Sequence, residues 1–135
     1  ENNLNPGDLG LEITETAELE DISRAAEYFE NLKSHGIPLA LDDFGAGYSS
    51  LSYLRDLPIK MVKLDKDFSR TVSEHDTQEL VKFVVSICEN MELDMLAEGI
   101  ETQEQQETFL KLGCDKGQGY FHHRPQFLEE FKEEF

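Results

Sequence analysis

The fold is decided by the segment Leu39-Ala40-Leu41-Asp42-Asp43-Phe44-Gly45-Ala46-Gly47-Tyr48-Ser49-Ser50-Leu51. An apolar run ends in two adjacent carboxylates, glycines follow, and two serines precede a new apolar pattern. This order is typical of a strand, a turn and the start of a helix. Because adjacent carboxylates repel each other without a cation between them, Asp42 and Asp43 are candidate ligands of a divalent metal. The alternative is an aspartate-rich turn that merely ends a strand, and this segment alone does not decide between them.

Composition limits the classes of protein that this chain can represent. Its 135 residues are 39% hydrophobic, which is enough for one domain with a buried core. The net charge of −17, from 12 basic and 29 acidic residues, argues against DNA binding through a broad basic surface. No apolar run approaches the roughly 18 residues of a membrane span. Two cysteines, Cys88 and Cys114, are expected to be reduced and buried, so the sequence predicts a cytoplasmic protein.

Strand and helix patterns alternate along the chain. Four strands are predicted, at Leu9–Ile13, Ile37–Leu41, Met61–Leu64 and Leu93–Ala97. Helices are predicted at Glu18–His35, Ser50–Arg55, Thr77–Met91 and Gln103–Leu112, followed by a charged helical tail. The strands are apolar almost throughout, as expected for strands covered by helices. The sequence therefore predicts an α/β fold of about four βα units with parallel strands.

Acidic residues recur where the predicted strands end, namely Glu12, Asp42 with Asp43, Asp65, and Glu98. In a parallel sheet or barrel these ends lie on one face, where active sites are found. Acidic residues are abundant in this chain, so one such position would mean little, but four in succession indicate a metal site. Lys63 lies within a predicted strand, where an ammonium group requires a counter-charge. The alternative is that Lys63 extends to solvent from a strand edge.

Five motifs together resemble a known family, the EAL domain. They are LEITE at 11–15, LALDDFGAGYSSLSYL at 39–54, VKLD at 62–65, AEGIET at 97–102, and GQGY at 117–120 with Pro125. The resemblance covers nearly the whole chain in the family's order. It implies hydrolysis of cyclic di-GMP to linear pGpG by a cyclic di-GMP phosphodiesterase.

The resemblance also implies roles for single residues. It assigns metal binding to Glu12, Asp42 and Asp43, and catalysis to Glu98 and Lys63. It assigns water or substrate positioning to Gln118, Asp65 and Glu101, and support of the loop at 44–50 to Glu15. The implied cofactors are two Mg²⁺ or Mn²⁺ ions about 3.5–4 Å apart.

The family's barrel has about 250 residues, and its glutamate-alanine-leucine signature, an arginine and an asparagine ligand precede the motif at Glu12. We therefore expect residues 1–135 to be a partial EAL domain, the C-terminal half of a (β/α)8 TIM-like barrel. The expected partners are cyclic di-GMP and either a second copy or the N-terminal half. One interpretation is the catalytic half of a phosphodiesterase, inactive alone. The alternative is an inactive remnant that binds cyclic di-GMP or another protein.

Overall fold

The computed structural model describes residues 4–14, 17, 19, 21–46 and 51–134. Its strands are β1 (Leu11–Thr14), β2 (Leu39–Phe44), β3 (Met61–Leu64), β4 (Asp94–Ala97) and β5 (Lys116–Gly117). Its helices are the 3₁₀ helix η1 (Pro6–Asp8), α1 (Ile22–Ser34), α2 (Leu51–Asp56), α3 (Lys66–Thr71), α4 (His75–Asn90), α5 (Gln103–Leu112) and α6 (Leu128–Glu134).

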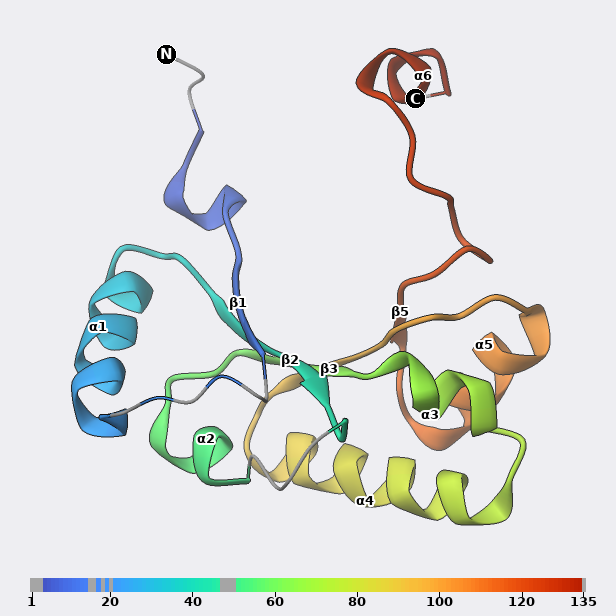
Figure 1. Cartoon of the computed structure of the whole chain (residues 1–135), viewed down its shortest axis with the longest axis horizontal. Coiled ribbons are helices and arrows are strands. Elements are labelled where there is room, and N and C mark those ends of the chain that lie inside the picture. The colour runs from blue at the N-terminus through green and yellow to red at the C-terminus, as the bar shows by residue number, and fades with distance from the viewer. Residues whose placement is uncertain (1–3, 15–16, 18, 20, 47–50, 135) are drawn as a thin grey trace.

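The strands form one five-stranded sheet in the order β1-β2-β3-β4-β5, and every adjacent pair is parallel. Each strand therefore lies beside its predecessor, as consecutive strands do in a βα barrel. Helices α1, α2 and α4 lie along one side of the sheet, and the N-terminal segment and α6 lie on the other (Figure 1). The predicted α/β class with parallel strands is confirmed.

The hydrophobic core lies between the sheet and these helices. Leu41, Val62 and Leu64 are fully buried, and α4 contributes Val81 to the same core. Because side chains alternate along a strand, the burial of Val62 and Leu64 against the helices directs Lys63 to the opposite face of β3. This alternation places an ammonium group on the face of the sheet where the candidate site lies.

Strand β2 is longer than predicted. It continues through the two aspartates to Phe44, and its register against β3 shifts between Leu41 and Phe44. Asp43 adopts a φ of 54°, a conformation that aspartate tolerates better than most residues. In a regular strand Asp42 and Asp43 would face opposite sides, but an irregularity of this kind re-aims side chains. Both carboxylates can therefore lie near the same site.

Other predicted bounds differ from the structure at the element ends. The predicted strand Leu9–Ile13 is β1, Leu11–Thr14. The predicted helix Glu18–His35 begins too early: α1 is Ile22–Ser34, because the extended residue Asp21 caps its start and accepts a hydrogen bond from the backbone N–H of Arg24. Strand Met61–Leu64 and helix Gln103–Leu112 are confirmed. Helix α3 and strand β5 were not predicted.

Cys88 and Cys114 are free and buried, as predicted. Burial raises the pKa of both thiols to about 11. Neither thiol is therefore ionised near neutral pH, and both serve as packing groups. Among the described helices, none combines the length and apolar character needed to cross a membrane.

Candidate metal and catalytic site

Lys63 lies at the centre of a carboxylate cluster built by four strands. Its Nζ lies 2.9 Å from Glu12 Oε1, 2.9 Å from Asp42 Oδ1 and 2.8 Å from Glu98 Oε1. These partners come from β1, β2 and the end of β4, so one side chain on β3 connects the whole edge of the sheet. The Lys63 side chain is 8% exposed, which contradicts the alternative of a lysine that extends to solvent.

The carboxylates determine the charge of Lys63. Burial alone would lower the pKa of this ammonium group, but its contacts with Glu98, Glu12 and Asp42 outweigh burial and raise the pKa above its ordinary value. Lys63 is therefore charged at neutral pH. It can donate to an oxygen atom but cannot accept a proton as a base.

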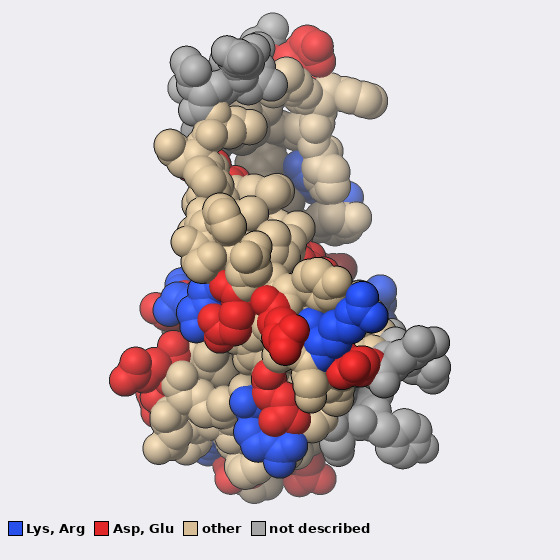
Figure 2. Space-filling model, turned by 90° about the vertical axis from the view of Figure 1, so that its left-hand side faces the viewer, with Lys and Arg blue, Asp and Glu red and all other residues tan. Residues whose placement is uncertain are grey.

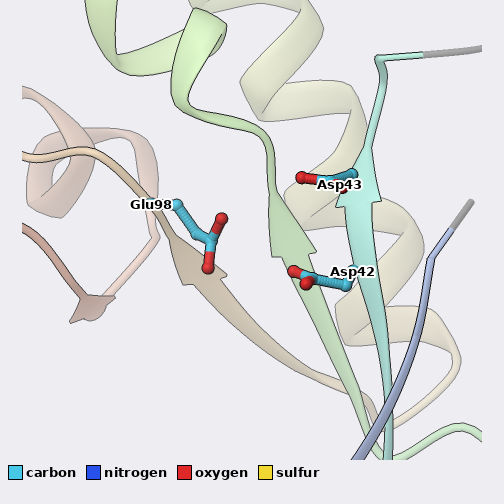
Figure 3. A group of neighbouring side chains, drawn as sticks. All are labelled: Asp42, Asp43 and Glu98. Atoms are coloured by element: carbon cyan, nitrogen blue, oxygen red, sulfur yellow. The ribbon is translucent and has the colours of Figure 1, made fainter.

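A second group of acidic atoms lies beside Lys63. One carboxylate oxygen from each of Asp42, Asp43 and Glu98 lies within 4.8 Å of the other two. Asp42 and Asp43 extend from β2, and Glu98 points toward them across β3 (Figure 3). Asp42 Oδ1 is buried, and no donor among the described residues is aligned with it for a hydrogen bond. Its contact with Lys63 is thus an ion pair without an aligned hydrogen bond. A group of carboxylate oxygens that includes a buried oxygen without a hydrogen bond suits a divalent cation.

Asp43 carries the electrostatic cost of this arrangement. Desolvation raises the pKa of its carboxyl group, as do the negative charges of Asp42 and Asp65, while Lys63 and Lys66 act in the opposite direction. The net effect is a raised pKa, so the folded chain disfavours the ionised form of Asp43. A bound cation would remove this penalty.

Two predicted residues make contacts that the sequence did not indicate. Asp65 caps α3, because its Oδ1 accepts a hydrogen bond from the backbone N–H of Asp67 at 2.8 Å. Glu12 is joined to the cluster through Lys63, and its side chain is 51% exposed. Glu15 lies outside the described residues, as do residues 47–50 of the loop that Glu15 was predicted to support.

A cavity of about 360 Å³ adjoins the cluster at the ends of β4 and β5. Glu98 and Gln118 line it together with Glu101, so the structure brings three predicted site residues to one opening. Lys66 and Arg70 of α3 line the same cavity, and the sequence analysis did not single them out. The cavity therefore combines carboxylates, an amide and two cations, a set suited to a polar, anionic ligand.

Charge on the wider surface is mixed. In Figure 2, Lys and Arg side chains are interspersed among Asp and Glu on the face that is turned toward the viewer. On this face the described residues form no broad basic surface, in agreement with the net charge of −17. The positive charges of Lys63, Lys66 and Arg70 near the site therefore do not belong to a broad basic surface on this face.

Comparisons with known proteins point to one family. The EAL domain family matches residues 1–125. The chain is 37% identical over 129 residues to the bifunctional diguanylate cyclase/cyclic di-GMP phosphodiesterase MucR of Pseudomonas aeruginosa, with 94% of this chain and 19% of MucR covered.

Solved structures show the same fold. The EAL domain of Mycobacterium smegmatis DcpA is similar with a TM-score of 0.88 and 34% identity, over 94% of this chain and 57% of that chain. A standalone EAL protein from Vibrio cholerae, solved in its c-di-GMP-bound form, has a TM-score of 0.82 and 30% identity, over 90% of this chain and 52% of that chain. The chain thus spans little more than half of these solved structures and 19% of the length of MucR.

Proposed function

This chain belongs to the EAL domain family, and we propose that it supplies one arc of a metal-dependent active site that hydrolyses cyclic di-GMP to linear pGpG. The observation that carries the proposal is the set of three ion pairs between Lys63 and Glu12, Asp42 and Glu98. A lysine buried among carboxylates at the ends of parallel strands has little value for folding alone, since desolvation offsets much of the attraction. The name of the Pseudomonas relative and the c-di-GMP-bound Vibrio structure support the choice of substrate.

Asp42, Asp43 and Glu12 are the proposed metal-binding residues, with Mg²⁺ or Mn²⁺ as the ions. Asp42 and Asp43 offer oxygens of the hard, anionic type that these ions prefer. Divalent ions supply a water molecule that ionises near neutral pH, and they neutralise charge on a phosphate group. Glu12 is joined to these residues through its ion pair with Lys63, and its side chain is half exposed.

Glu98 is the proposed general base. Its carboxylate lies within reach of Asp42 and Asp43, and the same residue lines the cavity. Lys63 is excluded from this role because its pKa is raised and the amine remains protonated. Lys63 instead holds Glu98 by an ion pair of 2.8 Å and donates to a water or phosphate oxygen that enters the cluster.

The remaining predicted residues are assigned to positioning. Gln118 and Glu101 line the cavity beside Glu98, where they can hold a water molecule or the nucleotide. Asp65 fixes the start of α3, the helix that brings Lys66 to the cavity. Glu15 is assigned to support of the loop after β2.

The test is Glu98→Gln in the natural polypeptide that carries residues 1–135. Loss of a base should lower kcat by about 10²-fold or more, with KM for cyclic di-GMP changed by less than about fivefold. The matched control is Glu104→Gln, which removes an exposed carboxylate from α5. Formation of pGpG is followed by chromatography.

The outcomes separate the two candidate functions. A Glu98→Gln variant with near-normal kcat would show that another group is the base. A wild-type polypeptide that binds cyclic di-GMP in a calorimeter without hydrolysing it, in the presence of Mn²⁺, would support a binding module instead.

A further inference from the structure

Two side chains outside the proposed site hold the loop at 98–102, which carries Glu98 and Glu101. The first is Ser69 of α3, which is 1% exposed. Its hydroxyl group donates a hydrogen bond to the backbone carbonyl oxygen of Glu98. The backbone of Glu98, the proposed base, is thus anchored to α3.

The second side chain is Gln105 of α5. Its Oε1 accepts hydrogen bonds from the backbone N–H groups of Glu101, at 2.8 Å, and Thr102, at 3.0 Å. The bond to Thr102 belongs to the capping box that begins α5. Its Nε2 donates at 2.8 Å to the backbone carbonyl oxygen of Ser69, 36 positions away, and this bond has no part in a cap.

The opposite side of the loop is held by the end of β5. The backbone N–H of Ile100 donates to Gln118 O at 3.0 Å, and the N–H of Phe121 donates to Ile100 O at 3.0 Å. A Cβ on Gly119 would collide with the backbone of Ile100, so the two segments are in close contact. The loop is therefore fixed between α3 and the segment after β5.

We propose that Ser69 and Gln105 are positioning residues: they hold the carboxylate of the base Glu98 beside those of Asp42 and Asp43, where it also contributes to cation binding, and they hold Glu101 at the cavity. This inference rests on the proposed function. Neither side chain reaches the cluster itself, so both act through the backbone of the loop. A displacement of about 1 Å at a reacting group can cost about 10²-fold in rate, and the Glu98 carboxylate is held within 4.8 Å of two other carboxylates.

The decisive variant is Gln105→Glu. A glutamate keeps the oxygen that accepts from Glu101 and Thr102, so the cap of α5 is preserved. It removes the amide that donates to the Ser69 carbonyl and replaces it with an oxygen that repels this carbonyl. The matched control is Gln103→Glu, because Gln103 lies on the exposed side of the same helix and contacts only Glu107 in the described hydrogen bonds.

The measurements are kcat and KM for cyclic di-GMP, and the affinity for Mn²⁺ alone from the electron paramagnetic resonance of the free ion. In the natural polypeptide that carries the chain, Gln105→Glu should lower kcat by about tenfold or more, with KM within about threefold of wild type. It should also weaken Mn²⁺ binding by about fivefold. Gln103→Glu should stay within about twofold of wild type on both measurements.

A second variant, Ser69→Ala, keeps the proposal testable if Gln105→Glu does not fold, and Ser86→Ala, at an exposed position of α4, is its control. If Ser69→Ala and Gln105→Glu lower only the melting temperature, while kcat and Mn²⁺ affinity of the folded protein stay unchanged, the two residues are merely structural and the proposal is overturned. A wild-type polypeptide that binds Mn²⁺ but hydrolyses nothing contradicts the proposed function alone, and the Mn²⁺ affinities of the variants then decide the inference. A polypeptide that neither hydrolyses cyclic di-GMP nor binds Mn²⁺ contradicts both.

Discussion

At the scale of single residues, one ammonium group stands among an excess of carboxylates. Lys63 compensates part of the charge of Glu12, Asp42 and Glu98, and Asp43 has no ion pair among the described residues. Charge in this cluster is therefore unbalanced in the metal-free chain. Because of this imbalance, we expect removal of the positive charge of Lys63 to destabilise the fold, and removal of the negative charge of Asp43 to stabilise it.

Replacement of Lys63 by methionine should destabilise the chain. The variant leaves three carboxylates facing one another, and loss of one partner from a buried ion cluster costs about 3 kcal/mol. Lys82→Met removes an exposed ion pair with Glu79 and should cost less than about 1 kcal/mol. The free energy of unfolding is measured in urea at pH 7 without metal.

The destabilisation caused by Lys63→Met should decrease as the pH rises. Because the folded chain raises the pKa of Lys63, the stability from its ion pairs is present below the ordinary lysine pKa and is lost as pH rises through the folded value. The difference in the free energy of unfolding between wild type and Lys63→Met should thus become smaller in strongly alkaline solution. A difference that grows above pH 10 would contradict the assignment.

Replacement of Asp43 by asparagine should have the opposite effect in the absence of metal. The pKa of Asp43 is raised by desolvation and by Asp42 and Asp65, so its ionisation is unfavourable in the folded chain and stability is lost as pH rises through its folded pKa. Asparagine has no charge and tolerates the φ of 54°. Asp43→Asn should raise the melting temperature by a few degrees at pH 7 in EDTA, and less at pH 4.

Mn²⁺ should reverse the order of the melting temperatures of wild type and Asp43→Asn. Mn²⁺ stabilises the form that binds it, so wild type should gain more in melting temperature than Asp43→Asn. The control is Asp115→Asn, which removes an exposed carboxylate outside the cluster. Equal gains for wild type and Asp43→Asn would exclude Asp43 as a ligand.

At the scale of elements, hydrophobic pattern predicted the strands and the longer helices, and with them the edge of the sheet where the site lies. It did not predict α3, because this helix has only six residues with no apolar repeat and is separated from β3 by Asp65 alone. It also missed β5, whose two residues form no apolar run. The irregularity in β2 depends on pairing with β3, which is a tertiary property, so the joint orientation of Asp42 and Asp43 was beyond reach of the sequence.

The residues that hold the loop at 98–102 could be predicted from the sequence only in part. Thr102 and Gln105 have the spacing of a capping box and were recognisable as a helix start. The bond from Gln105 to Ser69 joins positions 36 apart, and no local pattern indicates it. The pattern of acidic residues at strand ends indicated most of the candidate site, and the resemblance to a family added Gln118, Glu101 and Glu15 and the individual roles, whereas the contacts that place the side chains came only from the structure.

Gly99 allows a test of how closely α3 and this loop are packed. It has a φ of 67°, and a Cβ there would lie 2.6 Å from Lys66 Cβ. Gly36 has a φ of 84° with nothing within 4 Å of its Cβ position, so Gly36→Ala isolates the backbone cost of about 1–2 kcal/mol. Gly99→Ala should cost about 1–3 kcal/mol more in urea unfolding, because the steric contact adds to it. Equal costs for the two variants would show that the loop moves away from α3 freely.

At the scale of the whole molecule, the described strands form an open sheet rather than a closed barrel. Its order runs from β1 to β5, and no described strand pairs with the outer side of either. The solved EAL domain of DcpA is matched over 57% of its length, so the remaining part of that domain has no counterpart in residues 1–135. Exposed apolar side chains lie near both ends of the described chain, including Leu4, Leu9, Phe127 and Phe131. Open edges and apolar surface together favour association with a further segment.

We therefore predict that residues 1–135, produced by themselves, do not convert cyclic di-GMP to pGpG. The carboxylates of the proposed site come from one arc of strands, from β1 to the end of β4, which leaves the other side of a bound ion to water. Loss of preorganised groups around a reacting phosphate costs several kcal/mol, or about 10²–10³-fold in rate. Addition of the N-terminal part of an EAL domain as a separate chain should restore measurable turnover, because the open edges of β1 and β5 offer backbone groups for pairing.

The assay follows pGpG by chromatography with this chain, with the N-terminal part, and with both, at millimolar Mn²⁺. The control replaces this chain by its Glu98→Gln variant in the mixture, which should remove the restored turnover if the activity arises from this site. Turnover by residues 1–135 alone at the level of the mixture would contradict the prediction. Such a result would point to a second copy of the chain as the source of the missing arc.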